Sequence, residues 1–351
     1  MGNRYDERYN FRMATVNDVD AIMSFIHDEW GESHILAHNK ELFLWQYGAS
    51  EYGDNEKINV VLMTEKNNGD IVGMIGFVPY SQDVNNLHIS TAITKIKSRH
   101  VMPMAGIELM KRQNILVGEE ANFASGTNPD TIMPIFEKVF HHRVGIMQQY
   151  YILNPMVEKF RVAKPDKEEY DDSFVPYSYS LQEIFDIRDI ERHFDINKVN
   201  AHMSIKSKEY INKRFFCHPI YSYRKWFIQN SLNENLGVIF GREIIVDECK
   251  VLRLVDYRGD LEHLEKIGSA IRDLMELEGY EYIDLMVSDL SGYKLKEAGF
   301  NLLDPNGKTI IPHYFEPFVQ ENIKNHYQTN YDIVIFKADG DQDRPNTWKG
   351  E

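Results

Sequence analysis

The chain has 351 residues, enough for two domains of roughly 150 residues each, and its 43% apolar and 26% charged residues exclude an intrinsically disordered protein. A formal net charge of −15 would repel a phosphate backbone, so nucleic acid is a poor partner. The apolar runs 58–63 and 71–79 are far shorter than the roughly 20 residues of a membrane-spanning helix, which excludes a span there.

The first half of the sequence alternates strand and helix patterns. Asp18 can cap a helix in which Val19, Ile22 and Ile26 recur at helical spacing, and the turn sequence 67–70 indicates a hairpin. The expected elements are a strand at 11–14, helices at 17–30 and 40–47, strands at 58–64, 71–78 and 88–96, a helix at 107–113, a strand at 122–124, a helix at 131–139 and a strand at 144–151.

The second half repeats this order of elements with little sequence likeness, which indicates duplication followed by divergence. The acidic stretch 164–173 has the composition of a surface linker, so we expect one domain at 1–163 and another at 174–351. The expected elements of the second domain are a helix at 208–216, strands at 223–229, 236–240 and 251–256, a helix at 261–278, a strand at 282–287 and a helix at 291–298.

Two further features concern location and metal binding. Segment 1–12 lacks the apolar stretch of a secretory signal, so we expect a cytoplasmic protein. The whole chain has two cysteines, Cys217 and Cys249, and their spacing matches neither a disulfide framework nor a metal-ligand motif. We therefore expect no disulfide and no metal site.

Several phrases lie at matching places along this order of elements. Residues 11–18 have the pattern of a first strand followed by a helix cap. Residues 293–300 form the end of an expected late helix that closes with Gly-Phe. In the first half of the chain, Asn128 and residues 135–140 occupy the place that corresponds to this late helix. Together they resemble the GNAT superfamily of CoA-dependent N-acyltransferases. The resemblance implies two tandem GNAT-like α/β (α+β) domains, each a mixed, mostly antiparallel twisted sheet flanked by helices.

A narrower resemblance rests on Trp30 and five short phrases, which are 34–36, 45–47, 218–221, 312–318 and 339–346. These resemble tandem-GNAT enzymes of bacterial surface-polysaccharide (lipopolysaccharide O-antigen) biosynthesis. The resemblance implies transfer of an acetyl or 3-hydroxybutyryl group from acyl-CoA to a nucleotide-linked amino sugar, such as a dTDP-3-amino-3,6-dideoxyhexose. It leaves open an acyl carrier protein as donor.

An acyl-CoA donor carries a pyrophosphate, which the N–H groups and dipole of a helix start can bind. In the candidate loop 99–106 only Gly106 remains of the family's glycine pattern, so a plain strand-to-helix turn is the alternative. The first domain is the expected donor site because the matching turn 256–260 carries two carboxylates. Asn128 either bonds the pantetheine or only caps a turn. We expect a backbone N–H of residues 96–98 to polarise the thioester carbonyl. The expected donor-binding residues are Ile96, Lys97, Ser98, Arg99, His100, Val101, Met104, Ala105, Gly106 and Asn128.

The tyrosine acid usual in GNAT enzymes is absent, with Phe136 at its place in the first half and Leu295 in the second. His34 is the expected base, because it lies between the first two helices, where this fold forms the acceptor wall, and imidazole titrates near neutrality. His313 is the second candidate. Proton transfer through water to solvent is the alternative to both.

For the acceptor we expect aromatic rings that stack on a base or sugar and charged groups from segment 339–346. The alternative for that segment is a solvated acidic tail. The expected acceptor-binding residues are Trp45, Gln46, Tyr47, Tyr221, Arg224, Tyr314, Phe315, Asp339, Asp341, Asp343 and Arg344.

The expected reaction is direct attack of the amine in a ternary complex, with the acceptor between the domains. One alternative is an aminoacyl-tRNA-dependent transferase of tandem-GNAT type, against which the charge of −15 counts. The other is a non-catalytic binding or scaffold module, which the degraded glycine loop and the missing tyrosine would fit.

Overall fold

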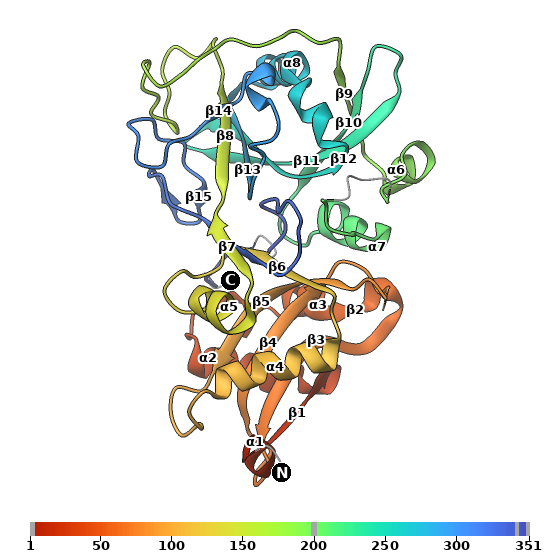
Figure 1. The fold of residues 1–351 in the computed structure, drawn as a ribbon, viewed down its shortest axis with the longest axis vertical. Coiled ribbons are helices and arrows are strands. Elements are labelled where there is room, and N and C mark those ends of the chain that lie inside the picture. The colour runs from red at the N-terminus through yellow and green to blue at the C-terminus, as the bar shows by residue number, and fades with distance from the viewer. Residues whose placement is uncertain (1–3, 84, 198–201, 341–343, 349–351) are drawn as a thin grey trace.

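The computed structural model describes residues 4–83, 85–197, 202–340 and 344–348. These residues form two bodies stacked along the long axis of the molecule, each built around its own sheet (Figure 1). The architecture is the expected mixed α/β arrangement, with helices flanking both sheets.

The first sheet has the strand order β1-β3-β4-β5-β6-β17-β7, with β2 paired to β3. All its ladders are antiparallel except that between β5 and β6, which is parallel. The strands are β1 (Tyr9–Thr15), β2 (Gly48–Ala49), β3 (Asp54–Glu65), β4 (Ile71–Pro79), β5 (His88–Ile96), β6 (Ala121–Ser125), β7 (Arg143–Ile146) and β17 (His326–Thr329).

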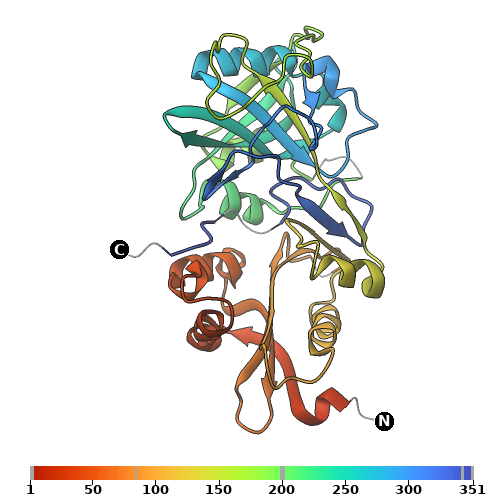
Figure 2. The ribbon, with the colours of Figure 1, turned by 90° about the vertical axis from the view of Figure 1, so that its left-hand side faces the viewer.

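Helices cover both faces of the first sheet. Along β3, Val60 and Leu62 pack into the core under α2 and α3, whereas Val61 and Met63 pack into the core under α4. This alternation is the period of two that a doubly covered strand requires. Figure 2 shows α2 and α3 on one side of the sheet and α4 on the other. The helices are α1 (Arg4–Arg8), α2 (Val19–Glu29), α3 (Lys40–Tyr47), α4 (Ala105–Val117) and α5 (Met133–Phe140).

The second sheet has the order β14-β8-β13-β12-β11-β10-β9 and is antiparallel except between β12 and β13. Ile271 and Met275 of α8 fill the core on one face, and Ile190 of α6 and Tyr210 of α7 pack on the other. The elements are β8 (Gln148–Leu153), β9 (Ser180–Glu183), α6 (Ile187–His193), α7 (Lys208–Ile211), β10 (Tyr223–Gln229), β11 (Asn235–Val246), β12 (Cys249–Gly259), α8 (Gly268–Glu278), β13 (Tyr280–Val287) and β14 (Asn301–Leu302). A small hairpin follows, formed by β15 (Tyr314–Phe315) and β16 (Phe318–Val319).

The two halves of the chain exchange strands. The strand expected at 144–151 is divided into β7 in the first sheet and β8 in the second. In return, β17 from the C-terminal part lies between β6 and β7, where Tyr327 is opposite Ser125 on one side and Gly145 on the other. The division at 164–173 into separable domains therefore stays a prediction, since strands on either side of it share both sheets.

Most expected elements are confirmed, and three of them, 40–47, 88–96 and 223–229, match to the residue. The helix expected at 261–278 is instead a 3-10 turn, Leu261–Glu265, followed by α8. The break lies at Lys266 and Ile267, and α8 begins at Gly268, where a Cβ would be 2.6 Å from the carbonyl oxygen of Ala298. The expected helix at 291–298 is reduced to the 3-10 turn Leu295–Ala298.

None of the helices in the described part of the chain combines the length and the apolar run that a membrane span requires. Within the same residues, no three His, Cys, Asp or Glu side chains gather in a way that would hold a metal ion.

Candidate active site

A cleft opens where β5 and β6 separate. The two strands pair only at His88–Ala121 and Ile89–Asn122, and beyond these pairs they diverge. The resulting cavity has a volume of about 580 Å³ and is lined largely by apolar side chains of β5, α4 and α5. Its lining includes Ile93, Ile96, Met110, Ile132, Ile135 and Phe136. We call it the donor cleft.

The edge of β5 that faces the cleft carries backbone donors. The N–H of Lys97 donates to Val72 of β4 at 2.8 Å. Since consecutive N–H groups of a strand point to opposite edges, the N–H of Ile96 points away from β4, toward the cleft that Ile96 lines. The N–H of Ser98 is engaged as well, with the Glu29 carboxylate at 3.0 Å. Of the three residues predicted to polarise the thioester, the geometry therefore favours Ile96 alone.

A bulge on β5 lies beside these donors. Gly76 of β4 is opposite Ile93, and Phe77 is opposite Thr91, so Ala92 is an extra residue in the ladder. Ala92 also lines the donor cleft. A bulge re-aims the backbone of its strand, which here lies along the wall of the cleft.

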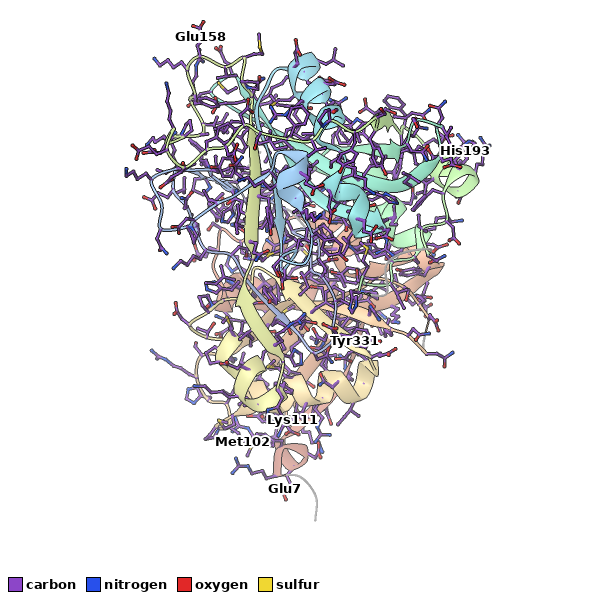
Figure 3. All side chains as sticks on the ribbon, turned by 45° about the horizontal axis from the view of Figure 1, so that its top comes forward. Glu7, Met102, Lys111, Glu158, His193 and Tyr331 are labelled. Atoms are coloured by element: carbon purple, nitrogen blue, oxygen red, sulfur yellow. The ribbon has the colours of Figure 1, made fainter. Side chains whose placement is uncertain are left out.

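The loop that precedes α4 is fixed to the N-terminal strand and helix. The N–H of Met102 donates to the Tyr9 hydroxyl at 2.9 Å, and the Tyr5 hydroxyl donates to the Pro103 carbonyl at 2.7 Å. Figure 3 shows Met102 and Lys111 close to Glu7, at the end of the first body. The N–H of Met102 is thus unavailable to a phosphate, whereas the first turn of α4 reaches the cleft at Gly106.

The predicted loop residues divide into two groups. Gly106, in the first turn of α4, lines the donor cleft. Arg99, His100 and Met104 are exposed, and Val101 and Ala105 pack in the core under α4. None of these five lines the donor cleft among its described residues. The positive charges of this loop therefore lie outside the cleft.

Asn128 lines the donor cleft and also shapes its own loop. Its side-chain oxygen accepts hydrogen bonds from the N–H groups of Asp130 at 2.9 Å and Thr131 at 3.1 Å. The side-chain oxygen of Asn128 thus stabilises its own turn, which is the alternative to pantetheine binding. Only its amide nitrogen remains to meet a ligand.

A second cavity, of about 330 Å³, lies beside the hairpin β15–β16 and the second sheet. We call it the acceptor cavity. It shares four lining residues with the donor cleft, which are Ser125, Gly126, Arg344 and Asn346. The two cavities therefore meet at the end of β6, where Ser125 is also held by β17.

The acceptor cavity is rich in positive charge, although the protein is acidic overall. Its described lining holds five cationic side chains and one carboxylate, Glu316. The cations are Arg242, Arg253, Lys324, Lys337 and Arg344. Arg253 is fixed by the Asp284 carboxylate at 2.9 Å and by the carbonyl of His313 at 2.7 Å. Such a lining attracts an anionic ligand.

Arg242, Lys324, Lys337 and Glu316 were not predicted as site residues. Arg242 lies in the alternating strand β11 and Lys337 follows an apolar run, so neither has a local signal that separates it from an ordinary surface charge. Glu316 lies inside the phrase 312–318 that carries the family resemblance. That phrase was the one sequence signal that could have identified it.

The two predicted bases have features that weaken a basic role. His34 lines the donor cleft, but its Nδ1 accepts the N–H of Leu36 at 3.2 Å, which places the proton of the neutral ring on Nε2. His313 lines the acceptor cavity, where burial, then the nearby Arg253 charge, lower its pKa to about 3. A general base works best with a pKa near the working pH, so His313 is a poor base at neutrality.

Several predicted acceptor contacts lie elsewhere in the structure. Gln46 and Tyr47 are fully buried, and Tyr47 packs against Gly76. The Trp45 ring packs against His218 with centroids 4.3 Å apart and ring planes tilted by 55°, and it lines neither cavity. Arg224 is bound by Glu183 at 2.6 Å and Glu278 at 2.8 Å, away from both cavities. Their positions along α3 and β10 direct these side chains into the core or onto a surface away from both cavities.

Asp339 is a further correction, because its side chain is fully buried rather than exposed to a substrate. Its carboxylate pairs with Lys206 at 2.6 Å and accepts the N–H of Phe336 at 2.9 Å. Asp341 and Asp343 lie outside the described residues. Tyr221, Tyr314, Phe315 and Arg344 do line the acceptor cavity.

Comparison with known proteins supports the fold. No protein-family model and no curated protein matches this chain. Among solved structures, a GCN5-related N-acetyltransferase from Anabaena variabilis ATCC 29413 is similar, with 9% identity, a TM-score of 0.54, and coverage of 92% of this chain and 72% of that one. A protein from Enterococcus faecalis V583, described as a probable N-acyltransferase, has 8% identity, a TM-score of 0.52, and coverage of 92% and 73%. The chain therefore has a GNAT-type fold.

Proposed function

We propose that the protein is an acyl-CoA-dependent N-acyltransferase whose acceptor is the amine of a nucleotide-linked amino sugar. The observation that carries the proposal is the meeting of the donor cleft and the acceptor cavity at Ser125 and Gly126. Two cavities with a shared wall allow two ligands to bind at once. This is the requirement of direct transfer in a ternary complex.

The donor cleft suits an acyl-CoA. Its apolar walls match the pantetheine arm and acyl chain, and Gly106 leaves room at the start of α4, where backbone N–H groups and the helix dipole favour a phosphate. When bound, acyl-CoA supplies the thioester carbonyl that the amine attacks. The N–H of Ile96 is the donor of this chain that is placed to stabilise negative charge on the carbonyl oxygen.

The acceptor cavity suits a nucleotide-linked sugar by charge. The two phosphates of such a ligand are anionic, and five cations line the cavity. Phe315 and Tyr314 supply apolar ring surface beside these charges, which suits a sugar or base. The resemblance of the phrases 312–318 and 339–346 to amino-sugar acyltransferases supports the same class of acceptor.

The test is a thiol-release assay with the full chain. We expect free CoA thiol when acetyl-CoA or 3-hydroxybutyryl-CoA is mixed with a dTDP-linked amino sugar, and an N-acylated sugar by mass spectrometry. The matched control is the same dTDP-sugar with a hydroxyl in place of the amine. Thiol release that does not depend on the amine, or none with any amino sugar, would contradict the proposal.

A further inference from the structure

Glu316 lies in the turn of the small hairpin β15–β16, between Phe315 and Pro317. Among the described residues that line the donor cleft and the acceptor cavity, it is the one carboxylate. Its negative charge makes it the described group of the two cavities that attracts a positively charged part of a ligand.

Two neighbours hold the Glu316 carboxylate through the same oxygen. The Tyr221 hydroxyl donates to Oε1 at 2.6 Å, and the Arg242 guanidinium donates to Oε1 at 3.2 Å. Arg242 in turn lies over the Tyr221 ring, 3.5 Å from its centroid. Within the described residues no partner of Oε2 is found. The carboxylate is thus oriented at one oxygen, and the other can accept a ligand N–H.

The hairpin that carries Glu316 also touches the junction of the two cavities. The side-chain amide of Asn346, which lines both cavities, donates to the Tyr314 hydroxyl at 2.8 Å. Tyr314 is two residues from Glu316 on the same hairpin. Tyr314 thus links the hairpin that carries Glu316 to a residue shared by the two cavities.

We infer that Glu316 binds the ammonium group of the acceptor and so selects an amine as the group to be acylated. The inference rests on the proposed function. The bound ammonium gives one proton through water to solvent before it attacks. The neutral nitrogen then forms a C–N bond to the thioester carbon, the C–S bond breaks, and the second nitrogen proton goes to the departing thiolate, giving free CoA thiol. Tyr221 and Arg242 are positioning residues for this carboxylate.

The experiment compares the wild type with Glu316→Gln, which keeps the shape and removes the negative charge. We expect kcat/KM for the amino sugar to fall roughly 10- to 100-fold, the loss of one hydrogen bond between charged groups. In calorimetry, we expect the wild type to bind the amino sugar roughly tenfold more tightly than its hydroxyl analogue, and Glu316→Gln to bind the two about equally. A residue that only stabilised the fold would not change this discrimination.

Further variants keep the inference testable. Tyr221→Phe removes one donor to Oε1 and should reduce kcat/KM for the amino sugar with little change in the affinity for acyl-CoA. Glu321→Gln, an exposed carboxylate five residues away that lines neither cavity, should leave both measurements unchanged. Retained discrimination and activity in Glu316→Gln would overturn the inference but leave the proposed function standing. A wild type inactive with every amino sugar would overturn both.

Discussion

The backbone N–H of Ser125 donates a 2.7 Å hydrogen bond to the carbonyl oxygen of Asp339. The bond ties the end of β6, where the two cavities meet, to a segment that follows β17. The side chain of Asp339 is part of a buried ion cluster with Lys206 and Asp256, so the wall of the proposed site is anchored in the core.

The first prediction concerns Lys206. Its ammonium is 2.6 Å from both Asp256 and Asp339, and all three side chains are at most 1% exposed. Lys206→Met removes the cation that contacts both buried carboxylates and leaves Arg258 as the nearby buried charge, so it should cost about 3–5 kcal/mol of unfolding free energy in urea denaturation. As a control, Lys40→Met, which breaks an exposed pair with Asp20, should cost less than about 1 kcal/mol. Equal effects of the two variants would refute this account.

Gly340 offers a test of the bridge to Ser125. A Cβ at this position would lie 2.5 Å from the carbonyl oxygen of Ser125, so Gly340→Ala must push the two segments apart. We expect a loss of about 1–3 kcal/mol in thermal or urea unfolding and lower transferase activity. Gly292→Ala is the matched control, because its Cβ meets nothing within 4 Å, and it should stay within about 0.5 kcal/mol of the wild type.

Gly106 tests the donor cleft. A Cβ there would lie 3.5 Å from Cγ1 of Ile96, an ordinary contact, so Gly106→Ala should fold and bind acyl-CoA. Gly106→Leu instead projects a branched chain into the cleft and should weaken CoA binding roughly tenfold or more, about 1.4 kcal/mol, in calorimetry. Unchanged CoA affinity in the leucine variant would place the donor elsewhere.

Asp18 gives a pH-dependent prediction. Its hydrogen bonds to the Arg12 guanidinium, and then to the backbone of Thr15, lower its pKa from 3.8 to about 2. Because the folded pKa is below the unfolded one, the stabilisation is present above about pH 4 and is lost as the pH falls to about 2. Asp18→Asn should cost about 1 kcal/mol at pH 7, since Arg12 is 46% exposed, and little near pH 2. A cost that stays constant with pH would contradict this.

The burial of His313 leads us to expect that the free energy of unfolding also depends on pH at higher pH values than for Asp18. The pKa of His313 falls from 6.5 to about 3 on burial, so below pH 6.5 the unfolded chain binds a proton that the folded protein excludes. Stability should therefore decrease as the pH falls from 6.5 toward 4, by up to about 1.4 kcal/mol per pH unit. His313→Gln can still donate to the Ile323 carbonyl and should flatten this slope in urea titrations. An unchanged slope would show that another group is responsible.

The elements of the fold could largely be predicted from the sequence, because they depend on local patterns. The spacing of Val19, Ile22 and Ile26 defines α2, and the turn at 67–70 joins β3 to β4. Tyr221, Tyr314, Phe315 and Arg344 were expected to bind the acceptor; they line one cavity, and their binding role stays a prediction. The burial of Asp339 was not, because an Asp-Gly phrase reads the same in an exposed turn as in a core.

The sequence by itself determined which segments become helices and strands, and that the chain repeats one order of elements. The tertiary structure decided which strands exchange between the sheets and which charges line a cavity. The four residues of β17 carry no pattern that selects β6 and β7, nearly 200 positions earlier, as partners. The unpaired edges that β6 and β7 present fix that choice, and through it the place of Ser125, Asp339 and the shared wall.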